Sequence, residues 1–64
     1  MTVKNMNNTD VDFDAAVNLM DDEIREEIAM EGYATEQEFF HAYEIAHALK
    51  YGEEWELSKK NPVW

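Results

Sequence analysis

The sequence predicts a mainly α-helical fold, a compact bundle of about three helices followed by a short extended C-terminal segment. Apolar residues make up 45% of the 64 residues, and they recur at the three- and four-residue spacing of a helix face. Polar N-cap residues and glycines bound these periodic runs. A chain of this length forms one domain with a small core. Because it has no cysteine, that core depends on helix packing or on self-association.

The first periodic run predicts a short helix over residues 12–20. Asp12 is a suitable N-cap, because its carboxylate can accept the free N–H groups of the first turn. Apolar side chains then follow at spacings of three and four, which places them on one inner face. That face consists of Phe13, Ala16, Val17 and Met20.

A second helix is predicted over residues 21–31. Ile24 and Ile28 are four residues apart and therefore share its inner face. Acidic residues fill its first turn, where they favour the helix by interacting with the positive end of the helix dipole. Gly32 lies at the usual C-terminal stop position.

The third helix has the clearest boundaries. Thr35 and Glu38 match a capping box, in which each side chain accepts the free backbone N–H of the other residue. Gly52 supplies the C-terminal stop. Between these boundaries lies an apolar arc wide enough to face two neighbouring elements. It consists of Phe39, Phe40, Ala42, Tyr43, Ile45, Ala46, Leu49 and Tyr51.

After the third helix, charged and apolar residues alternate over 53–57. This period of two predicts an edge strand or an extended arm, with Trp55 and Leu57 directed inward. A chain this short also needs most of its large side chains in the core. The aromatic residues expected there are Phe39, Phe40, Tyr43, Tyr51 and Trp55.

The domain boundaries follow from these elements. Residues 1–9 form a polar N-terminal segment whose order the sequence leaves open, with Val3 and Met6 available for a short strand beside the extended C-terminal segment. Residues 10–58 form a single helical domain, and residues 59–64 form a C-terminal tail. No apolar run is long enough for a signal peptide or a membrane span, so we expect a cytoplasmic protein of a bacterial host without a membrane partner.

The formal charge is −10, from 15 acidic and 5 basic residues. Direct nucleic-acid binding is disfavoured, because proteins bind phosphates with lysine and arginine. Solubility requires a net charge of only about 2 to 8 in a small domain. The cluster in the second helix therefore predicts contact with a basic partner, and the alternative is a solvated face that serves solubility in a protein with another role. Within the cluster, Asp21 and Arg25 have the (i, i+4) spacing of a helical ion pair. The clustered acids are Asp21, Asp22, Glu23, Glu26, Glu27 and Glu31.

Neither a catalytic site nor a cofactor is predicted. Carboxylates on a short solvated helix lack the cleft that separates two pKa values for acid–base catalysis. His41, Glu44 and His47 have the chemistry of metal ligands, but side chains advance about 100° per residue around a helix. These three residues therefore diverge, and only a homodimer could bring them to one ion.

Three stretches carry a resemblance to a known class of proteins. Residues 20–28 (MDDEIREEI), 35–43 (TEQEFFHAY) and 51–55 (YGEEW) resemble short acidic proteins carried by phages and mobile elements of gut Firmicutes. In size, charge and lack of cysteine the chain is also similar to anti-CRISPR and anti-restriction proteins, several of which mimic DNA. The resemblance implies an inhibitor that occludes a basic nucleic-acid-binding surface of a CRISPR effector or a restriction enzyme.

Two functional hypotheses follow. The first is this anti-defence inhibitor, and Tyr33 joins its binding surface because tyrosine in a loop is a frequent interface anchor. The second is an antitoxin-like or adaptor module that docks through Tyr33, Trp55 and Trp64. A homodimer is compatible with both. The predicted partner-binding residues of the inhibitor are Asp21, Asp22, Glu23, Glu26, Glu27, Glu31 and Tyr33.

Overall fold

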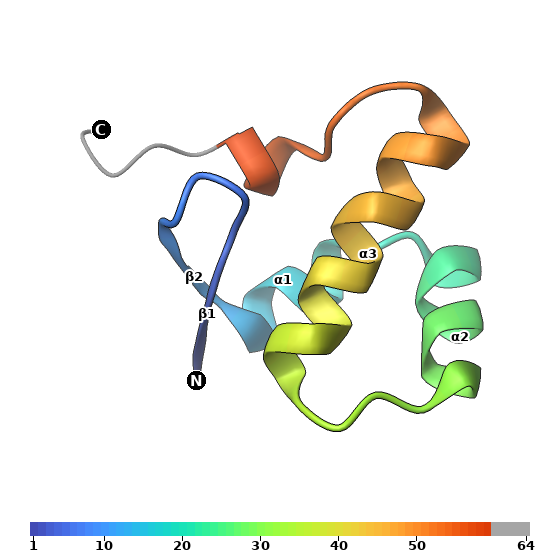
Figure 1. Ribbon diagram of the computed structural model, residues 1–64, viewed down its shortest axis with the longest axis horizontal. Helices are drawn as coiled ribbons and strands as arrows, with labels where there is room; N and C mark the ends of the chain where they lie inside the picture. The colour runs from blue at the N-terminus through green and yellow to red at the C-terminus, as the bar shows by residue number, and fades with distance from the viewer. Residues whose placement is uncertain (60–64) are drawn as a thin grey trace.

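Three helices and a two-stranded sheet form the described part of the chain, residues 1–59 of the computed structural model. The prediction of a mainly α-helical fold is confirmed. α3 lies at the centre, with α2 on one side and the β1–β2 hairpin on the other (Figure 1). In chain order the elements are β1 (Thr2–Lys4), β2 (Asp10–Asp12), α1 (Phe13–Leu19), α2 (Asp22–Glu31), α3 (Glu36–Tyr51) and the 3-10 turn η1 (Glu56–Lys59).

The predicted inner faces of α1 and α2 supply much of the core. Ala16 and Met20 from the first, and Ile24 and Ile28 from the second, are all buried. Phe13 and Val17 pack against them while staying partly exposed. The buried apolar residues are Val3, Val11, Ala16, Met20, Ile24, Ile28, Phe40, Tyr43 and Trp55.

Both short helices begin at an aspartate cap. The Asp12 carboxylate accepts from the N–H of Ala15 at 3.4 Å, and the Asp21 carboxylate accepts from the N–H of Ile24 at 3.2 Å. Asp21 is therefore the N-cap of α2 rather than its first residue. Gly32 ends α2 with φ of 73°, a conformation in which side chains with a Cβ are strained.

α3 begins at the predicted capping box, with one difference. The Thr35 hydroxyl accepts from the N–H of Glu38 at 3.1 Å, as predicted. The Glu38 carboxylate, however, accepts from the N–H of Ala34 at 3.2 Å instead of that of Thr35. Gly52 ends the helix in the left-handed conformation, as predicted.

The prediction of a strand or extended arm over 53–57 is wrong. Trp55 is buried as expected, with ring centroids 4.5 Å from Tyr43 and 5.5 Å from Phe40. The backbone then turns, because the N–H of Ser58 donates to the Trp55 carbonyl at 2.9 Å. The alternation of charged and apolar residues thus reflects a buried indole followed by a helical turn, in which Leu57 also packs against the core while partly exposed.

The predicted N-terminal strand forms, but it does not pair with the C-terminal segment. β1 runs antiparallel to β2, with Val3 opposite Val11, and Met6 lies in the turn that follows. Asn5 organises this turn, since its side-chain oxygen accepts the N–H groups of Asn7 and Thr9, both at 2.9 Å. Residues 1–9, whose order the sequence leaves open, therefore pack onto the helices. Residues 60–64 lie outside the described residues, so the boundary of the tail stays a prediction.

The apolar arc of α3 faces two neighbouring elements, as predicted, but part of it stays exposed. Ile45, Leu49 and Tyr51 have exposed fractions of 55%, 81% and 50%. α2 and the hairpin flank this helix on two sides (Figure 1). The described helices include none that is both long and apolar enough to cross a membrane.

Candidate protein-binding surface

The acidic surface lies on the outer side of α2. Burial of Ile24 and Ile28 against α3 directs the rest of this helix toward solvent. Five carboxylates of α2 are exposed, and with one partly buried arginine among them the helix is strongly negative. The exposed acids, which we call the acidic surface, are Asp22, Glu23, Glu26, Glu27 and Glu31.

Asp21 has a different environment from these five residues. Besides the N–H of Ile24, its carboxylate accepts the hydroxyl of Tyr51 at 3.0 Å and lies 3.4 Å from Nζ of Lys50. The bond from Ile24, followed by that from Tyr51, holds the pKa of Asp21 below its ordinary value. This predicted site residue therefore joins α2 to the end of α3.

Lys50 partly neutralises one edge of the acidic surface. Its Nζ lies 2.7 Å from a carboxylate oxygen of Glu23. This hydrogen bond is the main cause that raises the pKa of Lys50 above its ordinary value. Since the two residues are 27 positions apart, this pair is not evident from the sequence.

The predicted pair of Asp21 and Arg25 does not form. Arg25 instead contacts Asp22 at 2.8 Å, and its other terminal nitrogen donates to the carbonyl of Val17 at 3.3 Å. The reason is the capping role of Asp21, whose extended backbone turns its carboxylate toward the start of the helix. Arg25 therefore neutralises the first turn and spans toward α1.

The middle and end of α2 carry the charge that is not neutralised. Within residues 1–59, Glu26 and Glu27 have neither an ion pair nor a side-chain hydrogen bond. Glu31 accepts a hydrogen bond of 3.2 Å from the hydroxyl of Tyr33. Partial burial and the neighbouring Glu31 raise the pKa of Tyr33. Tyr33 thus lies at the C-terminal end of the acidic surface with 40% of its surface exposed.

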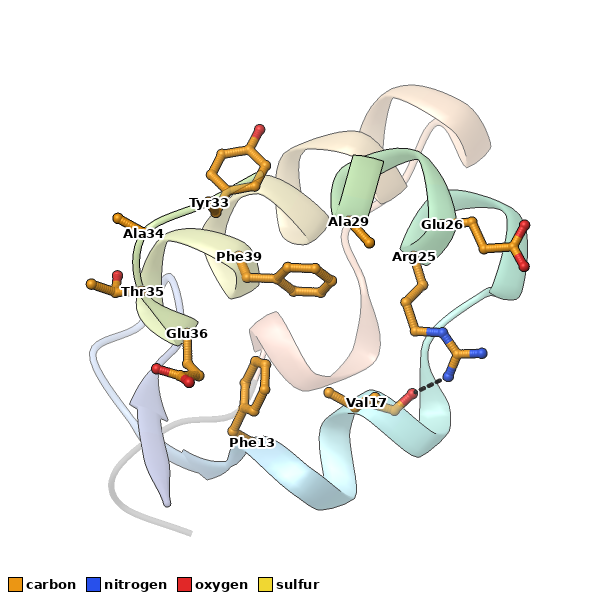
Figure 2. Close-up of a pocket in the computed structure, with 10 residues that line it drawn as sticks. All are labelled: Phe13, Val17, Arg25, Glu26, Ala29, Tyr33, Ala34, Thr35, Glu36 and Phe39. Carbon is orange, nitrogen blue, oxygen red and sulfur yellow. Dashed lines mark hydrogen bonds between the residues drawn. The ribbon is translucent and has the colours of Figure 1, made fainter. Parts of the chain in front are cut away.

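An apolar groove of about 460 Å³ adjoins this surface (Figure 2). The rings of Phe13 and Phe39 meet edge to face at its centre, with centroids 6.0 Å apart. Tyr33 lies on one wall, where its ring is 6.5 Å from Phe39. Figure 2 shows Arg25 on the opposite side, reaching toward Val17. The groove combines residues of all three helices, which explains why no local pattern predicts it.

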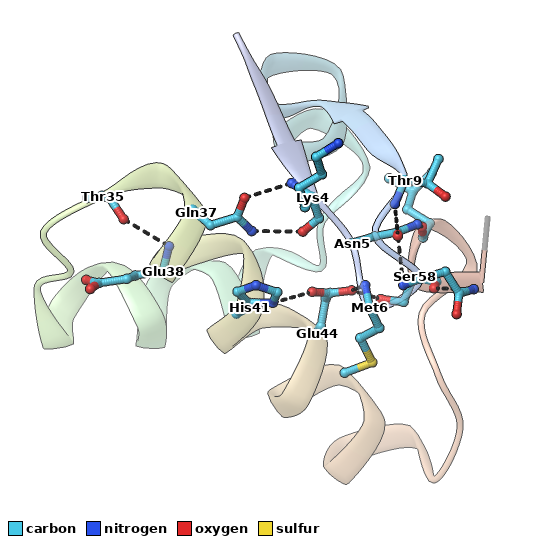
Figure 3. Close-up of polar contacts among 12 residues, drawn as sticks. Lys4, Asn5, Met6, Thr9, Thr35, Gln37, Glu38, His41, Glu44 and Ser58 are labelled. Carbon is cyan, nitrogen blue, oxygen red and sulfur yellow. Dashed lines mark hydrogen bonds and ion pairs between the residues drawn. The ribbon is translucent and has the colours of Figure 1, made fainter. Parts of the chain in front are cut away.

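The histidine and glutamate pattern of α3 has a structural role. Glu44 is fully buried and accepts the N–H of Met6 at 3.1 Å and the hydroxyl of Ser58 at 2.5 Å (Figure 3). Nδ1 of His41 lies 3.0 Å from its other oxygen. His47 instead contacts the ring of Tyr51 at a tilted angle, with centroids 4.8 Å apart. Among residues 1–59 no three histidine or acidic side chains are arranged to hold a metal ion.

The three aromatic residues of the docking hypothesis differ in where they lie. Trp55 is 6% exposed and belongs to the core, so its predicted docking role is wrong. Tyr33 is exposed at the groove, whereas Trp64 lies outside the described residues. Tyr51, expected in the core, is half exposed, and its hydroxyl donates to Asp21.

A comparison with protein families decides which class of acidic protein this is. Residues 4–55 match the family model of the anti-CRISPR protein AcrIC5. The chain belongs to this family. The AcrIC5 match includes β2 and all three helices. Among curated protein sequences, none matches the chain.

Membership of the AcrIC5 family confirms the anti-CRISPR part of the prediction. As a member of an anti-CRISPR family the chain is an inhibitor of CRISPR defence, and this membership implies binding to a CRISPR-associated protein complex. An origin in gut Firmicutes stays a prediction. The sequence of this AcrIC5-family chain does not predict the groove beside the acidic surface. It also does not predict the contact of Lys50 with Glu23 or that of Tyr51 with Asp21.

Proposed function

We propose that the acidic surface of α2 blocks a basic nucleic-acid-binding surface of a CRISPR effector by DNA mimicry. The observation that supports this most directly is the spacing of charge. α2 has ten residues and five carboxylates, and at a rise of 1.5 Å per residue it is about 15 Å long. This is one carboxylate per about 3 Å, and one DNA strand carries one phosphate per about 3.4 Å.

The rigidity of α2 supports the same proposal. Its start is capped by Asp21, its end by Gly32, and its inner face is held by two buried isoleucines. Carboxylates on such a helix are arranged before the partner arrives, which reduces the ordering cost of binding. A basic groove that binds phosphates would therefore meet carboxylates on α2 whose spacing is similar to that of the phosphates.

Within the acidic surface, we assign the main contacts to Glu26, Glu27 and Glu31. Asp22 and Glu23 have exposed ion pairs with Arg25 and Lys50. Such pairs contribute little and exchange readily for other partners, so these two acids add to the contact. Asp21, the sixth predicted acid, caps α2 and thereby holds the acidic surface in place. The inhibitor would act where the effector works, inside the bacterial host cell.

The experiment uses a purified CRISPR effector complex that the wild-type protein inhibits. The triple variant Glu26→Gln/Glu27→Gln/Glu31→Gln removes three charges from α2 without shortening a side chain. Its matched control, Glu53→Gln/Glu54→Gln/Glu56→Gln, removes three exposed charges near the C-terminal turn. The dissociation constant of each protein for the complex is measured over a range of salt concentrations, with and without a competing target DNA duplex.

We expect wild-type binding to weaken as salt rises and to compete with DNA, because charge pairs are screened. The α2 variant should bind roughly tenfold or more weakly at low salt and show a smaller salt dependence. The control should stay close to the wild type. Binding that is indifferent to salt, or equal losses in both variants, would contradict a specific role of the acidic surface.

A further inference from the structure

The outer side of α3 carries an apolar stripe that lies outside the acidic surface. Ala42, Ile45 and Leu49 follow at spacings of three and four, so they form one line along the helix. Ile45 is 55% exposed and Leu49 is 81% exposed. The opposite side of this helix carries the buried Phe40 and Tyr43. Ile45 and Leu49 therefore face away from the core, although branched side chains of this size normally pack inside a small domain, while Ala42 is partly buried and packs against the core at one end of the stripe.

Carboxylates border both ends of this stripe. At the Ala42 end, a shallow hollow of about 580 Å³ is shared with Tyr33, Glu38 and His41. At the Leu49 end, a second hollow of about 450 Å³ is lined by Glu23, Ile24, Glu27, Ala46, Leu49 and Lys50. Lys50, which lines the second hollow, forms an ion pair with Glu23. The stripe is thus an aliphatic surface with negative charge on its borders, next to the acidic surface.

The charges decide what kind of molecule fits this surface. A second copy of the chain would bring a further net charge of −10 toward the same borders, and like charges placed together oppose association. DNA and RNA are excluded for the same reason. A protein segment with aliphatic side chains beside lysine or arginine satisfies both parts of the surface, since its apolar groups cover the stripe while its cations reach Glu27 and Glu38.

We propose that the stripe of Ala42, Ile45 and Leu49 docks a basic amphipathic segment of the CRISPR-associated complex that this protein inhibits. The inference rests on the proposed function, in which the adjacent acidic surface binds the same complex. It adds aliphatic contacts, which mimicry of phosphates does not supply. Aliphatic contacts are not screened by ions, so the stripe provides affinity that persists at high salt.

The test compares the double variant Ile45→Ala/Leu49→Ala with Leu19→Ala. Both sets truncate exposed aliphatic side chains, and Leu19 lies on α1 with 65% exposure. Alanine favours helix, so the double variant keeps its fold, which circular dichroism verifies. Dissociation constants for the purified effector complex are measured at about 0.1 M and about 1 M salt, between which the Debye length falls from about 10 Å to about 3 Å.

The double variant should bind about tenfold or more weakly than the wild type at both salt concentrations, with an unchanged salt dependence. Leu19→Ala should bind like the wild type. Binding by the double variant within about twofold of the wild type would overturn the proposal. Sedimentation that reveals a wild-type dimer separated by the double substitution would also overturn it, because a second copy would then cover the stripe.

The α2 glutamine variant separates this proposal from the proposed function. If that variant binds normally while Ile45→Ala/Leu49→Ala is weakened at both salt concentrations, DNA mimicry fails and docking at the stripe is supported. If the glutamine variant is weakened and the double alanine variant is not, the stripe proposal fails and the acidic surface stands.

Discussion

The backbone N–H of Asp21 donates a hydrogen bond of 2.7 Å to the hydroxyl oxygen of Tyr43. Tyr43 is 1% exposed and lies in the middle of α3. The same aspartate caps α2 and accepts the hydroxyl of Tyr51 from the end of α3. Two turns of α3 therefore hold the residue at which α2 starts, and together with the burial of Ile24 and Ile28 this contact sets the direction in which the acidic surface faces.

Replacing Tyr43 with phenylalanine should lower the free energy of unfolding by about 1 to 2 kcal/mol. The ring volume stays nearly the same, but the N–H of Asp21 loses its acceptor inside the protein. Urea denaturation followed by circular dichroism measures the loss. Tyr33→Phe is the matched control, because its hydroxyl bonds Glu31 at the surface and its removal should change stability by less than about 0.5 kcal/mol. Equal stability of both variants would show that the buried bond contributes nothing.

Glu44→Leu should be among the most destabilising polar substitutions. The buried carboxylate accepts from Met6 in the N-terminal turn and from Ser58 in η1, so its loss leaves two donors without their acceptor. We expect the free energy of unfolding to fall by about 3 kcal/mol. Glu44→Gln retains an accepting oxygen and should lose less. If leucine were tolerated as well as glutamine in thermal melts, the network would have no stabilising role.

Asp21 should make the stability depend on pH at the acidic end of the range. Its folded-state pKa is lowered from 3.8, first by the bond from Ile24 and then by that from Tyr51. A lowered pKa means that its contribution is complete above pH 3.8 and is lost as the pH falls through the folded-state pKa. The stability difference between the wild type and Asp21→Asn should therefore be constant near neutral pH and shrink in acid. Urea denaturation at several pH values measures this difference, and a constant difference throughout would contradict the assignment.

Trp55→Ala should unfold much of the protein. The indole packs on Phe40 and Tyr43 and is 6% exposed, so truncation leaves a large cavity. Such substitutions cost about 3 to 5 kcal/mol, which is comparable to the whole stability of many small domains. Far-ultraviolet circular dichroism during heating measures the midpoint. A midpoint equal to that of the wild type would place this side chain at the surface and revive its docking role.

The helices of this protein are largely predictable because their signals are local. Asp12, Thr35 and Gly52 act within one turn of the residues they cap, and Ile24 and Ile28 share a face through helix geometry alone. The charge of the acidic surface is likewise present in the sequence, because consecutive turns of one helix carry it.

Contacts between distant residues account for what the sequence does not reveal. Val3 pairs with Val11 instead of with the segment near Trp55, because hairpin pairing depends on a turn built by side-chain contacts. Lys50 neutralises Glu23 across 27 residues. The exposure of Leu49 depends on which elements cover α3, and a periodic apolar pattern is the same whether or not a neighbour covers it. Local capping and spacing thus set the helices and their charge, whereas packing between them sets which carboxylates and aliphatic side chains a partner can reach.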